Sequence, residues 1–251
     1  MRKLITILGF FLLTISVSGQ IINASATYRA RASAGTYLTV LNDGNTKFWG
    51  MIGDGGATYL TLDGTAVTAW QDQSGNNNDL AQATGSRQPV YDSGNGEIDM
   101  NGDAGTDDYL SVAVTTDQPF TVYAVIRSNV RTNSHYLLYF NNISTSCVSV
   151  GDADNIIRLV SATTLTHSSA AVGSYGLITA ICNSTSSYIQ WNAASATTGD
   201  AGTNGSSIIR VGGASNSMQS SIKEYIFRAG SDSEANRILI QNYLNSKYSI
   251  Y

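Results

Sequence analysis

Residues Trp70–Leu80 read WQDQSGNNNDL, and this stretch decides the predicted fold. Gly, Asn and Asp tolerate a positive φ, and Asn and Asp side chains hydrogen-bond to their own loop backbone. The stretch therefore predicts a structured polar loop, entered from a strand that ends in a large anchoring aromatic, Trp70. A second acidic loop, NGDAGTDDYL, occupies residues 101–110. Together the two loops indicate a β-sandwich with polar loops on its rim rather than an enzyme.

Short apolar runs separated by turn residues continue this pattern before the loop. Thr36–Leu41 and Lys47–Ile52 predict a first hairpin, because the Asp-Gly pair at residues 43–44 is a favoured hairpin turn. Thr58–Leu62 and Ala66–Trp70 predict a second hairpin across another Asp-Gly pair. Both predicted hairpins are typical of an antiparallel β protein.

After the loop, Phe120–Arg127 is the clearest predicted strand. Its apolar residues fall on both faces, which is typical of a central strand covered on both sides. Turn signals separate the strands predicted after it, as in a sandwich. These are His135–Phe140, Ile156–Val160, Tyr175–Cys182, Ser187–Trp191, Ile208–Val211 and Ile222–Arg228.

A helical pattern occurs only at the C-terminal end. Ser231-Asp-Ser-Glu234 matches a capping box, which marks the start of a helix. The apolar residues that follow share one helical face: Leu239, Ile240, Tyr243 and Leu244. We therefore expect one short C-terminal helix that closes the sandwich.

The composition narrows the class of protein. The 251 residues allow one large domain or two small ones, and only 13% of them are charged. This profile is typical of secreted or virion β proteins. The net charge of −4, without a basic run, argues against a nucleic-acid partner.

The N-terminal residues 1–19 predict a signal peptide. Arg2 and Lys3 supply the positive start, and Leu4–Val17 supplies an apolar stretch shorter than a membrane span. A retained N-terminal hydrophobic anchor is the alternative, and no stable membrane span is expected after cleavage. The expected organisation continues with N-terminal strands or an extension at residues 20–57 and a sandwich domain at residues 58–251.

Two cysteines, Cys147 and Cys182, leave two interpretations open. Export makes a disulfide between them permissible, and the alternative is two half-buried thiols on neighbouring strands. Two separated histidines, His135 and His167, do not complete a zinc site with them. We expect both histidines at the surface or at a sheet edge.

Several of these runs resemble concanavalin A-like, laminin-G-like jelly-roll modules. Trp70–Asp79 is similar to their W-x-D-x-S-G-x-x-N-D segment, and Phe120–Arg127 to their "FTVFAVxR" strand. Met100–Gly102 with Thr106–Leu110 resembles "FDGxDDYL", with Met in place of Phe and a longer loop. The resemblance covers residues 60–251 and implies an all-β, two-sheet antiparallel jelly-roll sandwich. This fold hosts lectins, glycanases, adhesins and capsid or tail parts, so function has to be argued from a site.

Catalytic patterns are incomplete. Glu97 and Asp99 alternate onto one strand face, as a glycanase carboxylate pair would. The resemblance to laminarinase-type glycanases then requires a second Glu where this chain has Gly102. We interpret Glu97 as a solvated strand-edge residue, predict that the protein is not an enzyme, and keep glycoside hydrolysis as the third hypothesis.

Oxygen-rich side chains in the two loops make calcium a candidate cofactor. Calcium takes six to eight oxygens from carboxylates, amide carbonyls, backbone and water. The alternative is that these side chains satisfy the loop backbone, as in Asx turns. The candidate ligands are Asp72, Asn76, Asn78, Asp79, Asp107 and Asp108, with Asp103 nearby.

Aromatic side chains are the candidates for a glycan platform, because the apolar face of a sugar stacks on an aromatic ring. The candidate ligand-binding residues are Trp49, Tyr59, Tyr188 and Trp191. Each has a core position as its alternative, since large aromatics are usually packed inside. We assign Trp70 to the core.

The leading functional hypothesis is a non-catalytic glycan-recognition or adhesion module, secreted or displayed on the cell surface. Its expected partner is a glycan or cell-surface polysaccharide. The alternative hypothesis is a phage virion structural protein, such as a capsid or tail component, whose partners would be other virion or surface proteins.

Overall fold

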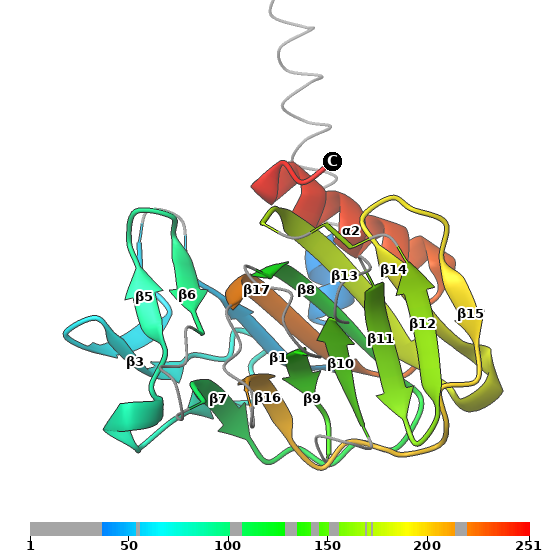
Figure 1. Ribbon diagram of the computed structural model, residues 1–251, viewed down its shortest axis with the longest axis horizontal. Helices are drawn as coiled ribbons and strands as arrows, with labels where there is room; N and C mark the ends of the chain where they lie inside the picture. Colours follow the sequence, from blue (N-terminus) through cyan, green and yellow to red (C-terminus); the bar gives the residue numbers. More distant parts are fainter. Residues whose placement is uncertain are drawn as a thin grey trace, which may run out of the picture.

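The fold is an antiparallel β-sandwich with one C-terminal helix, as predicted (Figure 1). It is seen in a computed structural model. The structure describes residues 37–53, 56–100, 107–128, 135–141, 146–150, 156–168, 170–171, 173–213 and 220–251. The predicted leader at residues 1–19 lies outside these ranges. No helix within them is long and apolar enough to cross a membrane.

The first layer is built around two long central strands, β8 and β17. Strand β17 pairs with β8 on one side and with β1 and β6 on the other, and the layer continues from β8 through β13 and β14 to β15. All of these pairings are antiparallel. The bounds are β1 Thr46–Met51, β6 Glu97–Asp99, β8 Phe120–Ser128, β13 Tyr175–Cys182, β14 Ser187–Trp191, β15 Thr197–Gly199 and β17 Ser220–Ala229.

The second layer runs in the order β3-β4-β7-β16-β9-β10-β11-β12. Strand β2 pairs with β3, and β5 connects β3 to β6 and so joins the two layers into one network. The bounds are β2 Leu60–Asp63, β3 Ala66–Trp70, β4 Leu80–Ala81, β5 Val90–Asp92, β7 Tyr109–Val112, β9 His135–Tyr139, β10 Ser146–Val150, β11 Ile156–Ser161, β12 Thr164–Ser168 and β16 Ile209–Gly212. Two short 3₁₀ helices complete the structure, η1 Gly85–Arg87 and η2 Ser184–Ser186.

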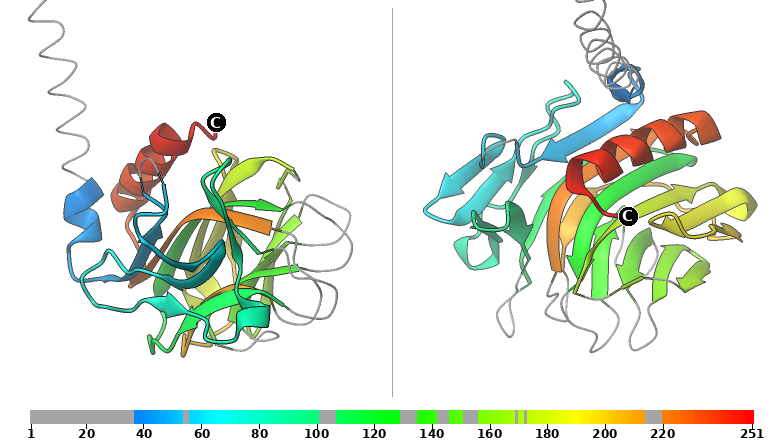
Figure 2. Two further views of the ribbon diagram at one scale, coloured as in Figure 1. Left: turned by 90° about the vertical axis from the view of Figure 1, so that its left-hand side faces the viewer. Right: turned by 90° about the horizontal axis from the view of Figure 1, so that it is seen from above.

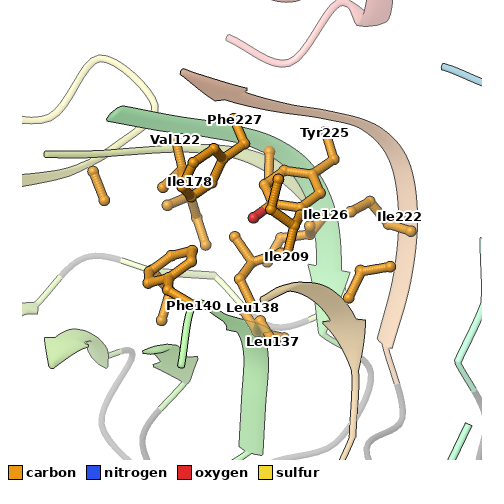
Figure 3. Close-up of a cluster of buried hydrophobic side chains, with 14 of the residues drawn as sticks. Val122, Ile126, Leu137, Leu138, Phe140, Ile178, Ile209, Ile222, Tyr225 and Phe227 are labelled. Atoms are coloured by element: carbon orange, nitrogen blue, oxygen red, sulfur yellow. The ribbon is translucent and has the colours of Figure 1, made fainter. Parts of the chain in front are cut away.

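Strand β8 shows why the layers stack. Phe120, Val122 and Ile126 belong to the core between the layers. Phe120 packs against Phe140 and Phe227 at ring-centroid distances of 5.0 and 5.1 Å. Figure 3 shows Val122 and Ile126 in this core. On the other face of β8, side chains join a second apolar cluster that contains residues of the C-terminal helix. The prediction of a central strand covered on both faces is confirmed.

The C-terminal helix α2, Glu234–Tyr248, covers the outer face of the first layer (Figure 2). Ile240 and Leu244 are its buried residues, and they belong to the same apolar cluster as β8 residues. Ser233 caps the helix by accepting a hydrogen bond from the Asn236 amide at 3.3 Å. The predicted capping box beginning at Ser231 was therefore wrong, because the chain enters the helix two residues later.

The first predicted hairpin was also wrong. Residues 37–41 are helical, and β1 pairs with β17 instead of with them. The buried Arg228 explains the arrangement, since its Nη1 donates to the Val40 carbonyl at 2.6 Å and its Nη2 pairs with Asp43 at 2.8 Å. Its Nε pairs with Asp232 ahead of α2 at 2.9 Å. The second predicted hairpin, β2–β3, is confirmed.

The two cysteines lie in different layers. Cys182 is buried on β13, and Cys147 belongs to β10, whose hydrogen-bonded neighbours are β9 and β11. The interpretation that they occupy neighbouring strands was therefore wrong. The Cys147 side chain lies outside the described part of the structure, so the disulfide stays a prediction.

Candidate functional site

The rim loop after β3 is held by its own side chains. Both oxygens of the Asp72 carboxylate accept hydrogen bonds, Oδ1 from the Trp49 amide at 3.0 Å and the Ser74 amide at 2.8 Å. Oδ2 accepts from the Ser74 hydroxyl at 2.8 Å and from the Asn78 amide at 3.0 Å. The Asp72 backbone amide donates in turn to Asp79 Oδ1 at 2.8 Å. These contacts agree with the alternative interpretation, in which the loop side chains satisfy the loop backbone as in Asx turns.

The asparagines of the same loop fasten it to β1. Asn76 and Asn78 donate their side-chain amides to the carbonyls of Thr46 and Lys47 at 2.6 and 2.7 Å. The loop, which follows β3 of the second layer, is thus hydrogen-bonded to β1 of the first layer. Each of these two side-chain amides therefore has a backbone acceptor.

The acidic residues of the second loop lie beside the start of β7. Asp108 is buried, and its carbonyl accepts from the Gly213 amide at 2.9 Å; Asp107 lies next to the same glycine. Asp103 falls outside the described residues. No group of three His, Cys, Asp or Glu side chains converges within the described ranges. Calcium binding by either loop stays a prediction.

The two candidate tryptophans occupy the core. Trp49 is 6% exposed and donates its indole N–H to Glu224 at 2.7 Å, and Trp191 is 4% exposed with its ring over Gly176. They belong to different apolar clusters, one on each face of the first layer. The core alternative holds for both rings. Trp70, assigned to the core from the sequence, is fully buried.

The two candidate tyrosines keep partial exposure but lie apart. Tyr188 on β14 has the Arg237 guanidinium over its ring at 4.6 Å, and its hydroxyl donates to Gln190. Tyr59 precedes β2, where its amide donates to the Ile52 carbonyl at 3.5 Å. The structure therefore does not gather the four predicted ligand-binding residues into one platform.

Glu97 corrects a prediction. It is 1% exposed and forms an ion pair with Arg127, so it is not a solvated strand-edge residue. The reason is register: β6 pairs with β17 inside the sheet, and Arg127 lies across β17 on β8. Burial and the neighbouring Glu97 charge raise the pKa of Asp99.

His167 also lies deeper than expected for a surface histidine. It belongs to β12, the last strand of the second layer, which confirms the edge location. Its ring is nevertheless buried, with Nδ1 3.0 Å from the Thr197 hydroxyl, and burial lowers its pKa. The side chain of His135 is outside the described residues.

A cluster of polar and aromatic side chains lies on β7, β16 and the segment around η1, on the face of the second layer that points away from the core. We call it the Tyr109 cluster and define it as Gln82, Arg87, Tyr109 and Arg210. Alternation along β7 and β16 explains the side-chain directions, since Leu110, Ile209 and Val211 are buried in the core.

The Tyr109 ring is the centre of this cluster. The Arg210 guanidinium carbon lies 3.6 Å from its centroid, and that of Arg87 lies 6.0 Å away. A cation over an aromatic face is attracted by the ring quadrupole. A hydrogen bond with the Gln82 side chain and the nearby Arg210 charge lower the pKa of Tyr109 against the opposing effect of burial.

One buried donor in the cluster lacks a partner. Arg210 Nε has no hydrogen-bond partner among the residues that the structure describes. Buried polar groups without partners are rare in folded proteins and call for an explanation such as a water or a ligand. Arg87 is exposed at the edge of the cluster. The cluster thus combines an aromatic ring, an amide and two guanidinium groups.

Sequence reasoning missed this cluster although parts of its signal were visible. Tyr109 stands in the quoted acidic loop motif, and Arg210 alternates with apolar residues on its strand. The separation of Arg87, Tyr109 and Arg210 along the chain hid their proximity, which arises only when β7 pairs with β16.

Comparison with known proteins finds similar folds among solved structures but no match by sequence. No family model and no curated protein matches the sequence. Among solved structures, botulinum neurotoxin type C, whose cell entry depends on interaction with two ganglioside molecules, superposes with a TM-score of 0.57 at 11% identity. That match covers 82% of this chain and 53% of the toxin chain. This chain therefore spans about half the length of that protein.

Two further structures show the same likeness. The binding domain of Paraclostridial Mosquitocidal Protein 1 has a TM-score of 0.55 at 16% identity, covering 81% of this chain and 53% of that one. Trypanosoma rangeli sialidase in complex with sialic acid has a TM-score of 0.55 at 11% identity, covering 81% and 33%. At these identities the likeness establishes the fold alone.

Proposed function

We propose that this protein is a non-catalytic glycan-recognition module, exported or displayed on the cell surface, that binds its ligand at the Tyr109 cluster. The observation that carries the proposal is the Tyr109 cluster itself: a partly exposed ring beside an amide and two guanidinium groups that pair with no described carboxylate. This combination suits sugar recognition, because rings pack on C–H faces while planar polar groups bind hydroxyls.

The structural relatives support a binding role. One of the three is a neurotoxin whose cell entry depends on interaction with two ganglioside molecules, and another is the binding domain of a mosquitocidal protein. The sialidase is an enzyme, but in this chain Glu97 of the Glu97–Asp99 pair is held in an ion pair and is not free to act as a glycanase carboxylate. Glu97 is engaged by Arg127 and lies on the layer opposite to the cluster. The resemblance of residues 60–251 to laminin-G-like jelly-roll modules fits the same proposal.

A glycan array tests this function. Purified protein is expected to bind a subset of glycans, and Tyr109→Ala is expected to abolish that binding because it removes the central ring. Tyr251→Ala is the matched control, since Tyr251 is an exposed tyrosine on the C-terminal tail beyond α2. Thermal unfolding of each variant shows that it is folded.

The outcomes separate the candidates. Absence of binding to every glycan, or binding that Tyr109→Ala leaves intact, contradicts the proposal. Repeating the array with a calcium chelator reports on the rim loops, because loss of binding would assign a ligand-linked calcium ion to them. Release of free sugar from any bound glycan would show that the protein is an enzyme.

A further inference from the structure

No carboxylate of the described residues forms an ion pair with the two arginines of the Tyr109 cluster. Elsewhere in the described structure, three buried or half-buried cations face carboxylates: Arg127 with Glu97, Arg228 with Asp43 and Asp232, and Lys247 with Glu224. Neither Arg87 nor Arg210 forms an ion pair with a described carboxylate. The two positive charges nevertheless converge on one tyrosine ring.

We infer that the ligand of the Tyr109 cluster is a saccharide carrying an anionic group, a carboxylate or a sulfate ester, which Arg87 and Arg210 hold. This inference rests on the proposed function and deepens it by naming the ligand class. Two like charges that lie close together repel each other, and an anion bound between them attracts both and offsets this repulsion. Arg87 is exposed, so an anion can reach its guanidinium from solvent.

The chemistry of the side chains selects this class. A guanidinium presents a planar fork of N–H donors that matches two oxygens of a carboxylate or sulfate group. The Tyr109 hydroxyl and the Gln82 amide are suited to the hydroxyl groups of the same sugar. A neutral glycan would use the ring and the amide but would leave both positive charges unpaired.

The net charge of the whole chain makes the inference sharply testable. At −4 the protein as a whole repels anions, so salt would strengthen a binding governed by overall charge. A local arginine pair predicts the opposite: affinity for the acidic sugar falls as salt is added. The direction of the salt dependence therefore distinguishes a built site from a general charge effect.

The experiment is a calorimetric titration with matched sugar pairs. The probes are sialyllactose against lactose and galactose sulfate against galactose, so the two arms separate the carboxylate from the sulfate ester. Wild-type protein is expected to prefer the acidic member of at least one pair. Arg87→Gln, on an exposed side chain, is expected to weaken that binding about tenfold, the loss expected for a hydrogen bond to a charged group.

Arg237→Gln is the matched control. It removes the same charge from another guanidinium that lies over a tyrosine ring, on the opposite side of the sandwich. Equal weakening by Arg237→Gln, or equal affinity of wild-type protein for the neutral and acidic members, overturns the inference. Binding of neutral sugars that still requires Tyr109 would refute the anionic class while upholding the proposed function. Failure to bind any sugar would refute both.

Discussion

Adding a single methyl group at Gly176 tests the packing of the sandwich most directly. A Cβ atom built at this position would lie 1.9 Å from Cζ2 of Trp191 and 2.4 Å from two further atoms of the same ring. Non-bonded carbon atoms rest about 3.5–4.0 Å apart, so ring and strand would have to separate by about 1.5–2 Å. Trp191 is fixed in the core between the layers and has little room to move.

We therefore expect Gly176→Ala to lower the free energy of unfolding by about 1–3 kcal/mol, the cost of overpacking a well-packed core. Denaturant unfolding measures this as a lower midpoint with an unchanged slope. Gly85→Ala is the control, because nothing lies within 4 Å of a Cβ at Gly85.

A double-mutant cycle identifies the clash itself. Trp191→Phe removes the outer ring of the indole, which contains the three atoms closest to Gly176. In that background Gly176→Ala should cost much less, giving a favourable coupling of about 1 kcal/mol or more. If the two changes are additive, or if Gly176→Ala is as mild as Gly85→Ala, the reasoning about this contact is refuted.

Three further predictions concern charged side chains. Arg228→Met leaves the buried carboxylate of Asp232 without its cation, and we expect a loss of roughly 3–5 kcal/mol in chemical unfolding; a loss under about 1 kcal/mol would contradict the assigned role. Burial and the Glu97 charge raise the pKa of Asp99, so its ionised form destabilises the fold at neutral pH and this penalty is relieved as the pH falls below the raised pKa. Asp99→Asn should therefore raise the thermal midpoint near neutral pH but not at about pH 3, where the carboxyl is already protonated. Asp92→Asn should instead lower the thermal midpoint near neutral pH. Hydrogen bonds from Asn95 and the Gly94 amide lower the pKa of Asp92, so its ionised form stabilises the fold, and this stabilisation is lost as the pH falls. Equal pH profiles for the two variants would disprove the assignment.

The sequence by itself determined the local elements. Alternation in Phe120–Arg127, the polar run after Trp70 and the helical face of Leu239–Leu244 each depend on neighbours within one element, and the structure contains a strand, an ordered loop and a helix there. Local chemistry was enough because strand and helix periods are fixed by the backbone.

Tertiary structure decided the pairing partners and hence the site. Residues 37–41 are helical, and Arg228, distant in sequence, binds the Val40 carbonyl at their end. Glu97 is buried because β6 pairs with β17 inside the sheet. The alternation of apolar residues along a strand does not specify its pairing partner, because many pairings bury the same apolar faces. Arg87, Tyr109 and Arg210 are adjacent only in the folded layer, where long-range strand pairing brings two positive charges to one ring.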